Sequence, residues 1–270
     1  MKLITLNTWG GRLFAPLSKF INSREKDVDI FCFQEVYDTS SDEVYTRTKR
    51  SHPVYEKNKL TNAHGARADI FSQVSKRLPN HKSFYHSSQD NTDFHGPVDF
   101  DLRFGLATFV KRNIQVSEHG DIFVHKSLNQ WTVDHSTMGR NMQWIKIRRN
   151  GKVFNICNFH GLWSHEGKED SRERIEQSKK IKEFLETLQG EIILCGDFNL
   201  NPNTQSIAIL EEGLINLVRQ FDVKSTRSKF YEKPEKFADY IFVSKGVWIK
   251  DFKVLKSEVS DHLPLFLEFG

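Results

Sequence analysis

The sequence predicts an α/β protein with mixed β-sheets, folded as one domain over residues 1–270. Short apolar runs of strand length alternate with amphipathic helical patterns in the front half of the chain and again at its back. Between these parts, residues 140–149 and 152–159 alternate as two strands. The Asn150-Gly151 turn that joins them predicts an antiparallel hairpin. No internal repeat, low-complexity tract or linker divides the chain.

The first half begins with a strand over residues 2–6, which ends at Asn7 and is followed by a tight bend at Gly10-Gly11. The patterns then predict a helix over 13–26, a strand over 29–33, a short helix within 38–51, a helix over 70–78, and strands over 82–86, 104–110, 114–116 and 122–124. Residues 87–101 are rich in turn formers, and we expect a loop that acts either as a substrate lid or as ordinary surface.

The second half continues from the hairpin with a long amphipathic helix over residues 169–189. Residues 191–195 follow as a short apolar strand of the kind that is covered on both faces. The remaining elements are a helix over 204–212, strands over 237–243 and 252–255, and a last strand from Leu265 onward. This order of elements completes the prediction of an α/β fold.

The composition is that of a soluble globular protein, with 38% hydrophobic and 27% charged residues. No apolar run approaches the ~20 residues that a transmembrane helix needs, and no signal peptide is visible, so we expect a cytoplasmic protein without a transmembrane segment. The net charge of +4 permits a phosphorylated ligand without requiring one. Cys32, Cys157 and Cys195 lie in apolar runs, and we expect reduced core thiols.

Polar side chains follow the ends of five predicted strands, where an α/β fold can bring them together at one rim. They are Asn7, Glu35, His160, Asp197 with Asn199, and Asp261 with His262. Hard divalent cations such as Mg²⁺ prefer oxygen ligands, and Glu35, Asp261 and Asn7 supply them. The combination predicts metal-assisted attack of water on phosphorus.

Two histidines in a cleft lined by carboxylates suit proton transfer or contact with phosphate oxygens. Asp239 lies inside a predicted apolar strand, and a buried carboxylate without a partner is costly. His262 is the natural partner. The absence of a cysteine–histidine cluster from the sequence argues against zinc.

Six short motifs occur in a specific order along nearly the whole chain: ITLN, FQE, NFH, GDFN, FADYIFVS and SDHLPL. With them the chain resembles the endonuclease/exonuclease/phosphatase superfamily, which includes repair nucleases, deoxyribonucleases, deadenylases, neutral sphingomyelinases and inositol-polyphosphate phosphatases. The resemblance implies a four-layer α/β sandwich, in which two mixed β-sheets pack face to face and are flanked by helices.

The same resemblance implies the roles of the site residues. Glu35 would be the principal Mg²⁺ ligand, with Mn²⁺ as a possible substitute, and Asn7 and Asp261 would complete the metal site. Asp197 would orient or deprotonate the attacking water, and Asn199 would bind the phosphate.

For each of the two histidines the resemblance implies two possible roles. His262, paired with Asp239, would contact a non-bridging oxygen or share the role of base. His160 would serve the leaving group or the phosphate. The glutamate that often supports this histidine as an acid has no equivalent in the segment LRFGLATF, which favours the phosphate contact for His160. A second departure is Leu6, where many members have tryptophan.

Three further residues are candidates for substrate binding: Arg140, Trp163 and Arg227. Arg140 either reaches a substrate phosphate or is a surface charge. Arg227 lies between Lys224 and Lys229, and this segment forms either a phosphate-facing loop or a solvated basic turn.

The sequence therefore predicts a Mg²⁺-dependent phosphoesterase that hydrolyses phosphodiesters or phosphomonoesters, with nucleic acid or nucleotides as the first choice of substrate. We expect it to act as a monomer. The alternatives are a phospholipid or sphingolipid headgroup phosphodiesterase, which the opening NTWG favours, and an inositol-phosphate phosphatase. A non-catalytic phosphate-binding scaffold is the last alternative, although Glu35, Asp197 and His262 are all present.

Overall fold

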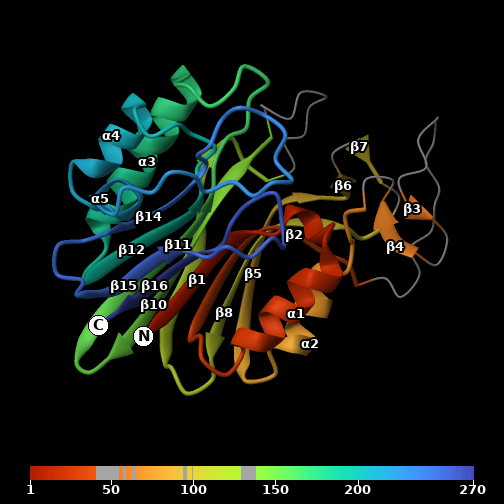
Figure 1. The fold of residues 1–270 in the computed structure, drawn as a ribbon, viewed down its shortest axis with the longest axis horizontal. Helices are drawn as coiled ribbons and strands as arrows, with labels where there is room; N and C mark the ends of the chain where they lie inside the picture. The colour runs from red at the N-terminus through yellow and green to blue at the C-terminus, as the bar shows by residue number, and fades with distance from the viewer. Residues whose placement is uncertain (41–54, 57–58, 63–64, 94–95, 99, 129–137) are drawn as a thin grey trace.

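Two six-stranded β-sheets pack face to face in the computed structural model, and helices cover both outer faces (Figure 1). The structure describes residues 1–40, 55–56, 59–62, 65–93, 96–98, 100–128 and 138–270. This arrangement confirms the predicted four-layer α/β sandwich. In the described residues, no helix is long and apolar enough to cross a membrane.

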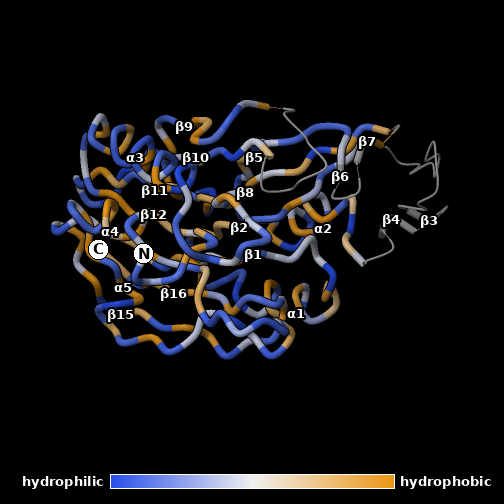
Figure 2. Tube along the Cα trace, turned by 90° about the horizontal axis from the view of Figure 1, so that it is seen from above, coloured by the Kyte–Doolittle hydropathy of each residue, from blue (hydrophilic) through white to orange (hydrophobic). Residues whose placement is uncertain are grey.

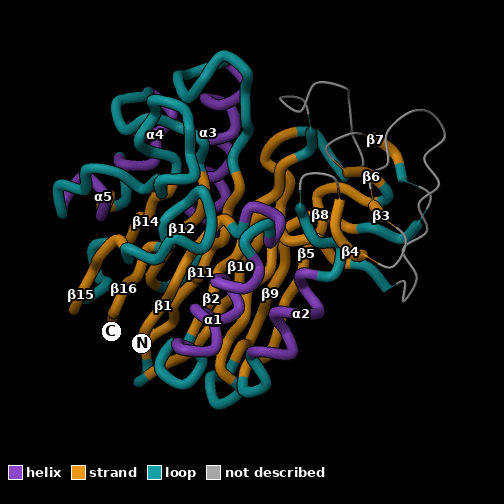
Figure 3. The backbone as a smooth tube through the Cα atoms, turned by 45° about the vertical axis from the view of Figure 1, so that its right-hand side comes forward, coloured by secondary structure: helices purple, strands orange, loops and turns teal. Residues whose placement is uncertain are grey.

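The first sheet has the strand order β15–β16–β1–β2–β8–β5. Its strands are β1 (Lys2–Asn7), β2 (Ile30–Asp38), β5 (His81–Asp90), β8 (Arg103–Lys111), β15 (Ile249–Val254) and β16 (Leu265–Phe269). Strands β1 and β2 run parallel, and α1 (Phe14–Arg24) connects them. This helix and α2 (Ile70–Arg77) lie together on the outer face (Figure 3).

The second sheet has the order β13–β14–β12–β11–β10–β9. Its strands are β9 (Val116–His125), β10 (Arg140–Arg149), β11 (Lys152–His160), β12 (Glu191–Asp197), β13 (Ile215–Asn216) and β14 (Asp239–Val243). Strands β11 and β12 run parallel and are connected by α3 (Arg172–Thr187). This helix packs with α4 (Gln205–Glu211), and α5 (Leu217–Gln220) packs on β14.

Five short elements complete the described structure: the 3₁₀ helix η1 (Trp9–Gly11), β3 (Tyr55–Glu56), β4 (Lys59–Asn62), β6 (Thr92–Asp93) and β7 (Gly96–Pro97). Hydrophobic segments recur along the strands of both sheets (Figure 2). Alternate residues of β2 serve two cores: Ile30 and Cys32 face the second sheet, whereas Phe31 and Phe33 pack toward α1 and α2. The three cysteines are buried and free, which confirms the prediction of core thiols.

A buried polar network joins the sheets beneath the strand ends. Asn158 of β11 accepts a hydrogen bond from Gln34 of β2 over 2.6 Å, and its own amide donates to the carbonyl of Phe33 over 3.2 Å. Thr108 of β8 donates to Gln143 of β10 over 2.6 Å. Because a buried polar group is costly unless it is paired, these bonds fix how the two sheets align.

The structure corrects the sequence prediction for β2. This strand does not end at Phe33 but continues to Asp38, with a bulge where Phe33 pairs with Ala107 and Val36 pairs with Gly105. Three residue steps on β2 therefore face two on β8, and Glu35 adopts a left-handed φ of 53°. Glu35 lies in this bulge and not at a strand end.

Other boundaries also differ from the prediction. Residues 87–90, expected to form a loop, extend β5 because they pair with β8, and β6 and β7 form a short hairpin beyond them. The strand β9 begins at Val116 and includes the strand expected at 122–124, whereas residues 114 and 115, also expected in a strand, lie outside it. The hairpin at Asn150-Gly151 is confirmed, with φ values of 50° and 78°. The short helix expected within 38–51 lies mostly outside the described residues.

Candidate active site

Three neighbouring strands of the second sheet bring three site residues into one row. His160, the last residue of β11, is the parallel partner of Asp197, the last residue of β12. Asp197 in turn is the antiparallel partner of Asp239, the first residue of β14. Residues directly opposite each other in a sheet project to the same face, so register alone gathers these side chains.

The first sheet contributes Asn7 at the end of β1, Glu35 from the bulge, and Asp261 and His262 from the segment before β16. Asn7 connects the two sheets: its Nδ2 donates to Glu35 Oε1 over 3.0 Å and to Asp197 Oδ2 over 2.9 Å. Its Oδ1 accepts from the backbone N–H of Trp9 over 2.9 Å, which fixes the orientation of the amide.

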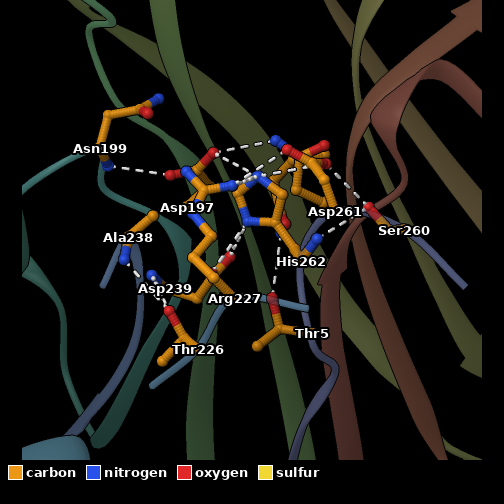
Figure 4. Close-up of polar contacts among 12 residues, drawn as sticks. Thr5, Asp197, Asn199, Thr226, Arg227, Ala238, Asp239, Ser260, Asp261 and His262 are labelled. Atoms are coloured by element: carbon orange, nitrogen blue, oxygen red, sulfur yellow. Dashed lines mark hydrogen bonds and ion pairs between the residues drawn. The ribbon is translucent and has the colours of Figure 1, made fainter. Parts of the chain in front are cut away.

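His262 and Asp239 form a buried pair, as predicted from the sequence (Figure 4). The ring Nδ1 lies 2.8 and 2.9 Å from the two oxygens of Asp239, and Nε2 lies 3.6 Å from Asp197 Oδ2. Burial and Arg227 lower the pKa of His262, but Asp239, Asp261 and Asp197 outweigh them and raise it. Asp239 therefore fixes the ring with its Nε2 near Asp197.

Asp197 remains a carboxylate although it is buried. Burial raises its pKa, but the opposing influence of His262, His160 and Lys168 holds that pKa well below its usual range. The backbone N–H of Asn199 donates to its Oδ1 over 2.9 Å, and the amide of Asn7 occupies Oδ2. The site thus contains a fixed, ionised acceptor at the end of β12.

His160 lies between two carboxylates, with Nε2 3.8 Å from Glu35 Oε1 and 3.7 Å from Asp197 Oδ2. Burial, followed by the charge of Arg140, lowers its pKa well below the ordinary value for histidine. The ring is therefore neutral at pH 7, which suits a hydrogen bond to a phosphate oxygen better than donation of a full proton.

Two arginines line the cavity together with the carboxylates. Arg140 is only 3% exposed, which excludes the surface-charge interpretation, and its Nε and Nη1 have no hydrogen-bond partner among the described residues. Nη1 of Arg227 lies 3.2 Å from Asp261 Oδ2 and also contacts His262 Nε2. The flanking Lys224 and Lys229 are exposed, so Arg227 alone of the three turns inward.

These side chains line a cavity of about 280 Å³. Its walls also include three aromatic residues, Trp9, Trp163 and Tyr231. Arg12 stacks over Trp9 at 4.7 Å from the ring centre, and Arg227 stacks over Tyr231 at 4.0 Å. The site therefore combines carboxylates and imidazoles at its base with cationic and aromatic walls.

The structure brings every predicted site residue to the site. The lining of the cavity includes His160, Asp197, Asn199, His262, Arg140, Arg227, Trp163, Glu35 and Asp261, whereas Asn7 and Asp239 contact lining residues from behind. Sequence reasoning missed Trp9, Arg12 and Tyr231 in the lining and Lys168 behind it. The Gly10-Gly11 bend pointed to Arg12 and the basic segment 224–229 to Tyr231, but no local signal distinguished Lys168.

The profile of the Endonuclease/Exonuclease/phosphatase family matches residues 4–262. The chain belongs to this family. Members of the endonuclease/exonuclease/phosphatase family hydrolyse phosphoester bonds. No match was found among curated proteins.

Solved structures of the family share the fold at low sequence identity. A protein from Bacteroides vulgatus is 15% identical with a TM-score of 0.67, and the match covers 100% of this chain and 98% of that one. A mannosyl-6-phosphatase from Bacteroides thetaiotaomicron is 19% identical (TM-score 0.65; coverage 100% and 99%). The human Nocturnin catalytic domain with bound sulfate is 15% identical (TM-score 0.64; coverage 100% and 94%).

Enzymes of the endonuclease/exonuclease/phosphatase family generally use divalent metals, and the residues here fit such an ion. Glu35, His160 and Asp197 offer ligand atoms that lie within 4.8 Å of one another, as do Asp197, Asp239 and His262. Burial raises the pKa of Glu35, and the charges of Asp261 and Asp197 raise it further despite the hydrogen bond from Asn7. A bound cation would reduce the electrostatic repulsion between these carboxylates.

Proposed function

We propose that this protein is a Mg²⁺-dependent phosphoesterase that hydrolyses phosphate esters of nucleotides or nucleic acid by in-line attack of water. One observation carries the proposal: an ionised Asp197, a paired His262 and two buried arginines line the same cavity. The expected monomer and its cytoplasmic location stay predictions.

Glu35 and Asp261 are the carboxylates that would hold the ion, with Asn7 beside them. When bound, Mg²⁺ would polarise a phosphoryl oxygen and neutralise charge at the phosphate. Asn7 presents its Nδ2 to the carboxylates in this arrangement, so its first contribution is to hold Glu35 and Asp197 in place.

Asp197 and His262 handle the attacking water. Asp197 is ionised, so it can hold the water and take its proton. His262 Nε2 lies 3.6 Å from Asp197 and can share this role when it is released from its contact with Arg227. Asp239 keeps the other ring nitrogen occupied and favours the protonated ring that results. His160 is neutral and acts as a hydrogen-bond contact to the phosphate.

Arg140, Arg227 and Asn199 bind the phosphate. Arginine is a donor-only group that matches phosphate oxygens in pairs. Nε and Nη1 of Arg140 have no acceptor in the part of the chain that the structure describes, and a phosphate would supply one. Trp9, Trp163 and Tyr231 form aromatic walls on which the ring of a base or sugar can pack.

A phosphomonoesterase activity is the second candidate, and the charges favour it. Arg12, Arg140 and Arg227 line the cavity beside three carboxylates, Glu35, Asp197 and Asp261, and both Asp239 and Lys168 are buried behind it. Addition of a divalent cation leaves a net positive site, which suits the dianionic phosphate of a monoester better than the single charge of a diester.

An activity panel tests both candidates. Nucleoside monophosphates, single-stranded DNA and RNA, a sugar phosphate, sphingomyelin and inositol phosphates are assayed with Mg²⁺ and with a chelator. We expect Mg²⁺-dependent turnover of nucleotides or nucleic acid, and its loss in His262→Ala but not in His119→Ala, an exposed histidine. Turnover of lipid alone contradicts the choice of substrate, and full activity of His262→Ala contradicts the mechanism.

A further inference from the structure

Lys168 is a buried cation that the chemistry above does not use. It lies in the segment between β11 and α3, is only 5% exposed, and its Nζ donates to Asn199 Oδ1 over 2.8 Å. Among the described residues it forms no ion pair within 4 Å, so this neutral amide oxygen is its close side-chain partner. A lysine is rarely buried without a paired charge, so its position needs a reason.

The contact determines which way the amide of Asn199 faces. An amide side chain offers an oxygen acceptor on one side and an NH₂ donor on the other, and the two orientations have almost the same shape. Lysine can only donate, so its ammonium forms a hydrogen bond with Oδ1 but cannot form one with Nδ2. Nδ2 then donates one hydrogen to the carbonyl of Gly161 over 3.3 Å.

One N–H of Asn199 Nδ2 is left without a partner among the described residues, and Asn199 lines the cavity. A reversed amide would present an oxygen, which repels the oxygens of a phosphate. The backbone of Asn199 is fixed as well, by a left-handed φ of 54° and by its N–H bond to Asp197. The amide orientation then depends on Lys168 at Oδ1, over 2.8 Å, and on the carbonyl of Gly161 at Nδ2, over 3.3 Å.

We propose that Lys168 is a positioning residue for phosphate binding, which locks Asn199 with its N–H donor toward the substrate phosphate. The inference rests on the proposed function, because it assigns a phosphate to this cavity. Burial and the charge of Arg227 lower the pKa of Lys168 to about 8, so the ammonium remains the main form at neutral pH and can act as the donor.

The side chain can be tested separately from the loop that carries it. Asn201 donates its backbone N–H to the carbonyl of Lys168 over 2.9 Å, and a substitution of the side chain leaves that bond in place. Lys236 is a matched control, because it is an exposed lysine that lines the same shallow surface depression as Lys168.

The experiment is a double-mutant cycle of Lys168 and Asn199. For each variant, calorimetry measures the binding of inorganic phosphate in the presence of Mg²⁺, and kinetics give KM and kcat on the best substrate of the panel. The loss of a hydrogen bond to a charged group lowers an affinity by about 10- to 100-fold. We therefore expect Lys168→Met to weaken phosphate binding and to raise KM by that factor. We expect Lys168→Arg to restore most of the binding, and Lys236→Met to change nothing. In an Asn199→Ala background, Lys168→Met should have no further effect.

Asn199→Asp keeps an acceptor for Lys168 but removes the N–H donor, so we expect it to bind phosphate no better than Asn199→Ala. This second variant keeps the test valid even if Lys168→Met lowers the melting temperature. The inference about Lys168 is wrong if Lys168→Met lowers phosphate affinity equally with and without Asn199, or if Asn199→Asp binds phosphate tightly. Either result leaves the proposed function standing. A wild-type protein that neither binds phosphate nor hydrolyses any ester overturns the proposed function itself.

Discussion

The two sheets supply the site in different ways. In the second sheet, His160, Asp197 and Asp239 are partners in a regular ladder, so their side chains meet because the strands pair. In the first sheet, Asn7 ends a strand, but Glu35 lies in a bulge and Asp261 in the segment before β16. Regular strand pairing holds reactive side chains rigidly. A bulge or loop instead points a single side chain in a direction that regular strand pairing does not allow.

The largest effect is expected from the regular half of the site. Asp197→Asn keeps the shape and the bond from Asn199 N but removes the ionised acceptor, so kcat should fall by about 10³-fold. Steady-state kinetics on the best substrate measure the loss, and an unchanged circular dichroism spectrum shows that the fold survives. A kcat within tenfold of wild type would mean that Asp197 is not the group that handles the water.

The irregular half should control the metal. Glu35→Gln removes a charge from the implied ion ligand, and we expect Mg²⁺ affinity to fall by at least about 10- to 100-fold. Without metal the same variant should melt higher than wild type near pH 7. Burial and the neighbouring carboxylates raise the pKa of Glu35, so its charge destabilises the fold above the ordinary glutamate pKa.

Titration calorimetry with Mg²⁺ and melting curves in a chelator check both halves of this prediction. Glu118→Gln, at an exposed glutamate of β9, is the control and should alter neither. A lower melting temperature for metal-free Glu35→Gln would contradict the view that these carboxylates repel each other.

The network between the sheets should have a smaller effect on activity and a clear effect on stability. Asn158→Leu leaves Gln34 and Thr108 with buried groups that lose a partner, which should cost about 3 kcal/mol of unfolding free energy. Asn155 is buried on the same strand, but among the described residues its side chain donates only to the backbone carbonyls of Gln189 and Glu191. Asn155→Leu should therefore lower stability with little change in kcat.

Urea unfolding and kinetics on both variants separate the two effects. If Asn158→Leu and Asn155→Leu lower kcat equally, alignment of the sheets has no special role in the site.

The smallest expected effect is on the pH dependence of stability, and it comes from His81, at the end of the first sheet that lies away from Glu35. Burial lowers the pKa of His81, whose Nε2 lies 3.0 Å from the carbonyl of Val28. As pH falls below about 6.5, the unfolded chain binds a proton that the folded chain resists, so stability falls. His81→Gln should lose less stability between pH 7 and pH 5.5, in melts compared with His165→Gln at an exposed site. Identical slopes would contradict the prediction.

The sequence predicted well what depends on local pattern. The strands that end in His160 and Asp197 were expected because apolar runs stop at polar residues, and the hairpin because Asn150-Gly151 favours a left-handed turn. The bulge at Glu35 was missed because it arises from pairing with β8, a strand about 70 residues away in the sequence. The burial of Arg140 and Lys168 was likewise not foreseeable, since it depends on which distant segments cover them.

The bulge also determines which changes of chain length the protein tolerates. A deletion of one residue between Phe33 and Val36 would reduce the three steps on β2 to two, which matches the two steps on β8 and lets Val36 pair with Gly105 in a regular ladder. Without the extra residue the bulge would disappear, and the Glu35 carboxylate would no longer point into the site. At this position the number of residues, and not only their identity, is under functional constraint, so comparison or redesign of this strand must preserve its count.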